Sequence, residues 1–361
     1  MYEEGKARIK FVEGAFLNPE ARFSRDLSMA IVNGFAARGT RILDPTAATG
    51  IRGIRYYKET NSEEVTLLEI NESVSKITKK NLGFNKVKAK LLNQSIQEFA
   101  NTAHETFDVI DLDPFGSVAP NLYDIMKLTH DGTYLFLTAT DTAVLCGAQE
   151  KACLRIYDAK PMHNELCHEV GIRILLGYAA RTAAQFNYGI KPIMSLSYAH
   201  YMRLFLKLES GANAAAASIK RLGYAHHCEK CGFRNTEQAT FPKLQKCQLC
   251  GTYLETAGKL WAGQLQDREA IFETVRRFRE SSTYGEAGLK TLETIAGESE
   301  TPLYYSVPKL TKKLNIPAVS PNYLIERLRE SRYEATRTHF DSSSIRTNAD
   351  IQKINKILNA L

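Results

Sequence analysis

Five apolar runs between residues 41 and 138 alternate with amphipathic segments, and this alternation constrains the fold more than any other feature of the sequence. The runs lie at 41–44, 64–70, 89–92, 109–112 and 133–138, and the segments between them have helical periodicity. Strands that alternate with helices over short connections form parallel sheets with right-handed crossovers. We therefore predict an α/β fold built on a Rossmann-like, doubly wound sheet.

The run at 109–112 ends in an acidic residue, a proline and an aromatic residue, which are Asp113, Pro114 and Phe115. Ligands of open α/β sheets bind at the carboxyl ends of the strands. A carboxylate at that position can accept a hydrogen bond from an amino group while the ring stacks on a flat base. The alternative is a strand that simply ends in a turn, because Asp and Pro are common turn residues.

Three other strand ends carry features of a cofactor site. Residues 44–50 form a turn of small residues before a helix, where free N–H groups can meet a ligand. The turn lacks the Gly-x-Gly-x-x-Gly and P-loop patterns. Glu69 follows about 20 residues later, a spacing that suits a ribose diol, and Gln94 and Ser95 could contact an adenine edge. A tight turn without a ligand and a solvated Glu69 are the alternatives.

Four of the seven cysteines form two Cys-x-x-Cys-Gly pairs, and fifteen residues separate the pairs. This spacing is typical of a four-cysteine zinc ribbon, which we place at about 226–253. Four thiolates leave no open position for water, so the Zn²⁺ would be structural. The predicted ligands are Cys228, Cys231, Cys247 and Cys250. We expect Cys146, Cys153 and Cys167 to be buried thiols.

The length of 361 residues favours two domains, which we place at 1–220 and 221–361. The net charge is +7, and residues 221–361 hold 21 Lys and Arg against 16 Asp and Glu. This excess permits a nucleic-acid partner, although basic side chains also solvate helix faces. The second domain is predicted to be α+β, with the zinc ribbon and a winged-helix part.

The apolar runs are shorter than the roughly 20 residues that a membrane helix needs. The charged segment at 1–10 lacks the apolar core of a signal peptide. We expect a cytoplasmic chain that is a monomer without an obligate protein partner.

In combination, the strand ends match S-adenosyl-L-methionine-dependent methylation of an exocyclic amine. The Asp-Pro-Phe step resembles the Asp/Asn-Pro-Pro-Tyr/Phe motif of amino-methyltransferases, without the second proline. Longer runs resemble the tRNA guanine-N2-dimethyltransferases, especially archaeal ones. These runs are 44–55, 111–117, 140–147, 167–173 and 337–340.

The resemblance implies a class I methyltransferase domain that methylates N2 of guanine 26 in tRNA twice, giving N2,N2-dimethylguanosine. It assigns Asp113, with Pro114, as the acceptor for the N2–H group, and Phe115 as the ring that stacks on the flipped guanine. The implied contacts to the cofactor come from Arg25 and Arg55 at the methionyl carboxylate, Glu69 at the ribose, Gln94 and Ser95 near the adenine, and Asp44, Thr49 and Gly50 in the loop. The alternatives are methylation of another RNA or DNA base, and a non-catalytic zinc-ribbon RNA-binding protein.

Overall fold

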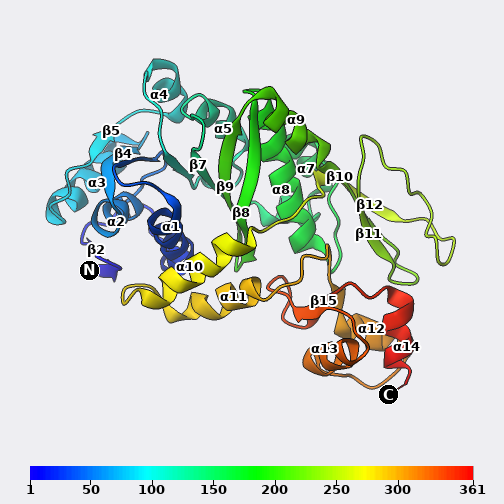
Figure 1. Ribbon diagram of the computed structural model, residues 1–361. Coiled ribbons are helices and arrows are strands. Elements are labelled where there is room, and N and C mark those ends of the chain that lie inside the picture. Colours follow the sequence, from blue (N-terminus) through cyan, green and yellow to red (C-terminus); the bar gives the residue numbers. More distant parts are fainter. Residues whose placement is uncertain (361) are drawn as a thin grey trace.

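The computed structural model describes residues 1–360 (Figure 1). Within these residues the central feature is a seven-stranded sheet of order β5-β4-β3-β6-β7-β9-β8. The first five of these strands in the sequence are parallel to one another, and β9 is antiparallel to its neighbour β7. The edge strand β8 pairs with β9 in an antiparallel hairpin and so runs in the direction of the first five. The strands are β3 (Thr40–Asp44), β4 (Ser62–Leu68), β5 (Lys90–Leu92), β6 (Val109–Leu112), β7 (Tyr134–Ala139), β8 (Tyr188–Tyr198) and β9 (Tyr201–Ser210). The predicted doubly wound α/β fold is confirmed.

Both faces of the sheet are buried, which explains why its strands are apolar without strict alternation. Successive strand residues point to opposite faces. Leu43 and Ile110 join one hydrophobic cluster with helices α5 (Ala119–Met126) and α8 (Cys167–Ala184). Their neighbours Ile42 and Val109 join a second cluster with α1 (Arg22–Phe35). Further helices of this part are α2 (Ile51–Glu59), α3 (Glu72–Phe84), α4 (Ile96–Thr102) and α9 (Ala212–Lys220).

The connection at 139–168 contains two short helices. They are α6 (Thr142–Leu145) and α7 (Glu150–Tyr157). Leu145 and Tyr157 are fully buried in the cluster that contains α8. Helices of one or two turns offer too few apolar positions for a periodic pattern, so packing against α8 rather than periodicity stabilises them.

The chain after residue 220 begins with a three-stranded antiparallel sheet of order β11-β10-β12. Its strand β12 lies against α8, where Gly177 allows the backbone of Leu260 to approach closely. The strands are β10 (Leu222–His227), β11 (Arg234–Gln238) and β12 (Glu255–Trp261), and the helices that follow are α10 (Arg268–Glu280) and α11 (Glu286–Ala296). Both helices share a hydrophobic cluster with α1, so packing is continuous across residue 220.

Residues 305–358 form a smaller module with its own hydrophobic cluster, at the lower right of Figure 1. It contains β13 (Tyr305–Ser306), α12 (Val307–Leu314), α13 (Pro321–Glu330), β14 (Ala335–Arg337), β15 (Ser344–Thr347) and α14 (Ile351–Leu358). Two helices followed by antiparallel strands are compatible with a winged-helix module, which stays a prediction. The domain boundary at residue 220 also stays a prediction. No helix of residues 1–360 is long and apolar enough to cross a bilayer.

Candidate active site

A cavity of about 630 Å³ lies at the carboxyl ends of β3, β4, β5 and β6. The strand order reverses between β3 and β6, and such a switch point is where doubly wound sheets bind ligands. Its volume lies within the range of small-molecule sites. The lining comes from residues 16–18, 44–49, 68–70, 94–97, 113–115 and 199–201, together with single residues of other segments.

The turn after β3 takes its shape from left-handed backbone at Ala48 and Gly50. A Cβ on Gly50 would lie 2.9 Å from the Thr78 side chain, so the position requires glycine. The Ala48 N–H donates to Glu69 Oε2 at 3.0 Å, which joins the turn to the end of β4. The Asn71 N–H donates to Oε1 at 2.9 Å. Each oxygen of Glu69 therefore keeps a further lone pair for a hydroxyl group.

A buried ion network lies beneath the cavity, with Arg52 at its centre. Arg52 donates to Asp111 Oδ2 at 2.8 Å and also to Asp113 Oδ2. Arg203 donates to the other oxygen of Asp111 at 2.7 Å. Burial would raise the pKa of Asp111, but Arg203 and Arg52 outweigh it and lower the pKa. Burial raises the pKa of Asp44 to about 7, with Arg52 opposing the shift.

Asp113 stands at the rim of this network, with 26% of its side chain exposed. Its Oδ2 is held by Arg52, and its Oδ1 has no hydrogen-bond partner within residues 1–360. Phe115 is 76% exposed, and its ring lies edge-on to the ring of Phe16, with centroids 4.8 Å apart. The site thus combines a free carboxylate oxygen with two aromatic rings at the cavity wall.

The structure separates the two arginines that were assigned to the cofactor carboxylate. Arg25 lines the cavity and holds Glu4 through two bonds of 2.6 and 2.5 Å. Arg55 is fully buried outside the lining, where it binds Glu4, Asp26 and Glu59. Arg52, which was not predicted as a site residue from the sequence, lines the cavity instead.

Gln94 and Ser95 both line the cavity at the end of β5. The Ser95 hydroxyl, however, bonds the backbone N–H and the carboxylate of Glu98 and so caps α4. Ser95 can offer a ligand its backbone more readily than its side chain.

The cavity wall contains several polar atoms that are buried and lack a hydrogen-bond partner among the described residues. Such atoms usually find a partner, because leaving them unpaired costs free energy. They are Ser24 Oγ, Asp44 Oδ2, Thr49 Oγ1 and Tyr201 OH. This set suits a ligand with several polar groups, as S-adenosyl-L-methionine has.

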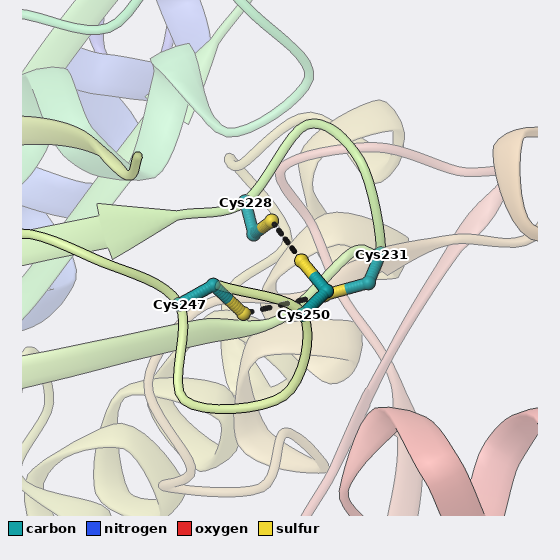
Figure 2. A group of neighbouring side chains, drawn as sticks. All are labelled: Cys228, Cys231, Cys247 and Cys250. Carbon is teal, nitrogen blue, oxygen red and sulfur yellow. Dashed lines mark hydrogen bonds between the residues drawn. The ribbon is translucent and has the colours of Figure 1, made fainter. Parts of the chain in front are cut away.

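The four cysteines of the two pairs lie together at the ends of β10 and β12 (Figure 2). Sulfur atoms of Cys228 and Cys250 are 3.5 Å apart, and those of Cys231 and Cys247 are 3.4 Å apart. Tetrahedral Zn–S bonds of about 2.3 Å place sulfur atoms roughly 3.8 Å apart. Each pair turns through a left-handed glycine, so both have the form of a zinc knuckle. The group therefore fits a zinc ion.

One aromatic residue of the cavity, Phe16, and one basic residue, Arg52, were not predicted from the sequence. Phe16 lies about a hundred residues before Phe115, in a segment without regular structure, so no pattern joins them. The signal that could have pointed to a residue such as Arg52 is Asp111, because an acidic residue inside a buried strand requires a cationic partner.

A model of the N2,N2-dimethylguanosine tRNA methyltransferase family matches residues 2–359. The tRNA (guanine(26)-N(2))-dimethyltransferase of Methanobrevibacter smithii is 34% identical over 375 residues, covering 99% of this chain and 97% of its own. The protein of the same name from Pyrococcus horikoshii is 36% identical over 371 residues, covering 96% and 94%.

The same relationship holds for structure. A solved complex of Trm1 from Pyrococcus horikoshii with S-adenosyl-L-methionine matches with a TM-score of 0.91 at 34% identity, covering 99% of this chain and 98% of that one. The resemblance drawn from the motifs is confirmed. Because both the family model and the relatives extend over almost the whole sequence, the chain belongs to the N2,N2-dimethylguanosine tRNA methyltransferase family.

Proposed function

We propose that this chain transfers two methyl groups from S-adenosyl-L-methionine to N2 of guanine 26 in tRNA, giving N2,N2-dimethylguanosine. The observation that carries the proposal is Asp113, whose free carboxylate oxygen and neighbouring aromatic rings lie at the cavity of a chain from this family. The names of the relatives give the same base and position.

The cofactor occupies the cavity beside the turn after β3. Glu69 accepts hydrogen bonds from the ribose hydroxyls, because each of its oxygens keeps a free lone pair. Arg25 faces the methionyl carboxylate, and Gln94 lies near the adenine. The Trm1 structure with bound S-adenosyl-L-methionine supports this use of the cavity. When bound, the cofactor supplies an electrophilic methyl group.

Asp113 is the proposed catalytic residue. Guanine N2 is a poor nucleophile, since its lone pair is delocalised into the ring. The free Oδ1 accepts a hydrogen bond from N2–H and takes up the proton as the new C–N bond forms. Arg52 fixes the other oxygen, so the carboxylate does not have to reorient during the reaction.

The second methyl transfer can use the same acceptor. After the first transfer, N2 keeps one hydrogen, and one carboxylate oxygen is sufficient to hold it. Rotation about the bond between C2 and N2 returns this hydrogen toward Asp113. Asp113, whose side chain is 26% exposed, releases the first proton to solvent, and a second molecule of cofactor replaces the spent one. Two successive transfers therefore need no second acceptor.

The guanine must leave the folded core of tRNA to reach this cavity, as in other enzymes that modify bases. Phe115 and Phe16, both exposed at the wall, offer the stacking surface for the extruded base. Residues 221–361 hold tRNA through phosphate contacts, which the excess of basic residues supports.

The four-cysteine group binds Zn²⁺ as a structural ion. It occupies the ends of a small sheet whose loop at 239–254 carries little regular structure. The metal joins both knuckles, and four thiolates leave no position for substrate.

Transfer from labelled S-adenosyl-L-methionine to an unmodified tRNA transcript tests the proposed function. Nucleoside analysis should find N2,N2-dimethylguanosine in the wild-type transcript and no label in a transcript with adenine at position 26. Label at another guanine or on another base would contradict the proposed site of modification.

A further inference from the structure

A second group of metal-ligand side chains lies outside the lining of the cavity and is separate from the four cysteines of the zinc ribbon. The ligand atoms of Cys146, Cys167 and His168 are all within 4.8 Å of one another. Cys146 directly follows α6, and Cys167 and His168 are the first two residues of α8. We expected Cys146 and Cys167 to be buried thiols, yet both are half-buried, whereas Cys153 is buried. His168 is exposed.

The surrounding chain holds these three side chains in place. Gly147 has left-handed backbone, and a Cβ there would lie 2.7 Å from the Met162 carbonyl oxygen. The loop before α8 is therefore pressed against the end of α6. The neighbours of the two cysteines in the sequence, Leu145 and Leu166, are fully buried. The cysteines are carried by packed elements rather than by a free loop.

The histidine is oriented as in many metal sites. Its Nδ1 lies 3.4 Å from the carbonyl oxygen of Phe340, in the module after residue 300. Metal-binding histidines commonly donate one ring N–H to a carbonyl group, which leaves the other nitrogen for the metal. The contact also links the start of α8 to the C-terminal module.

We propose that Cys146, Cys167 and His168 bind a second Zn²⁺ ion, with the fourth coordination position open to water or a small ligand. Two thiolates and an imidazole are a ligand set that zinc accepts. Tetrahedral zinc bonds bring ligand atoms to roughly 3.5–3.8 Å, so small rotations of the side chains complete the site.

The inference does not rest on the proposed function or on zinc in the ribbon.

Counting zinc in the full-length chain tests the site. Wild-type protein and a His168→Ala variant are loaded with Zn²⁺ under reducing conditions, passed through gel filtration and measured by elemental mass spectrometry. The wild type should retain one zinc ion more per chain than His168→Ala. A variant of an exposed histidine outside the group, His104→Ala, should match the wild type.

A double variant, Cys146→Ser with Cys167→Ser, should also lose one zinc ion, and circular dichroism checks that each variant is folded. Equal zinc content in the wild type and the His168→Ala variant would overturn the proposal. A disulfide would also overturn the proposal. It would show as the loss of two free thiols on air oxidation of the wild type but not of the double variant, with equal zinc content in all forms.

Discussion

Replacing Arg52 by methionine should slow methyl transfer by more than its effect on folding explains. The Arg52 side chain is 5% exposed, and its guanidinium is bonded to both Asp111 and Asp113. Removing one partner of a buried ion pair typically costs 3–5 kcal/mol, and because Asp111 keeps its bond to Arg203, we expect about 3 kcal/mol of lost unfolding free energy.

The rate should fall for a different reason. Without Arg52, Asp113 Oδ2 loses its partner and the carboxylate can rotate away from the guanine. Misplacement of a reacting group by about 1 Å can cost roughly 10²-fold in rate, which is the fall that we expect. Single-turnover transfer at saturating tRNA and cofactor measures this step, and urea unfolding measures stability.

Arg173→Met provides a matched control. Arg173 is also buried, binds Glu169 at 2.8 Å, and leaves that carboxylate with a second partner, Arg346. It lies outside the lining of the cavity. Arg173→Met should lose similar stability and keep its single-turnover rate at a temperature where both variants are folded. Equal rates in the two variants would refute the positioning role of Arg52.

Three further predictions follow from other parts of the structure. Phe16→Ala should raise the KM for tRNA and leave cofactor binding intact, because about 1–3 kcal/mol of base stacking is lost; an unchanged KM would exclude this ring from the guanine site. Burial would raise the pKa of Glu4, yet Arg25 and Arg55 lower this pKa to about 2. The ionised Glu4 side chain therefore stabilises the folded protein above pH 4.5, and this contribution is lost as the pH falls toward 2. The wild type should therefore exceed Glu4→Gln in unfolding free energy by up to about 3 kcal/mol at pH 6, and a difference that stayed constant down to pH 2.5 would contradict this. Chelation of zinc should abolish hydrogen-exchange protection in residues 222–261 while β3–β7 keep theirs, and protection that survives metal removal would refute a structural zinc ion.

The sheet could be predicted from the sequence because each parallel strand is buried on both faces, and such strands are continuous apolar runs. Its carboxyl ends meet at one edge, so Asp44, Glu69, Gln94 and Asp113 could be expected around one cavity without knowledge of the packing. The four cysteines could also be predicted as zinc ligands, since their spacing alone fits a zinc ribbon.

Other features depend on contacts that no local pattern encodes. Arg52 and Arg55 lie one helical turn apart in the same run, and their roles differ because Asp111 meets one and Glu4 meets the other. Phe16 reaches Phe115 only through the path of the N-terminal segment. The short helices at 142–157 form against α8 and have too few residues for a periodic signal.

The most direct test of the central claim is single-turnover methyl transfer by Asp113→Asn. The amide keeps the size of the side chain but removes the negative charge and the capacity to take up the N2–H proton. We predict that transfer to guanine 26 falls by at least about 10²-fold while S-adenosyl-L-methionine binding, measured by calorimetry, is retained. Transfer at the wild-type rate with intact cofactor binding would contradict the catalytic role of Asp113.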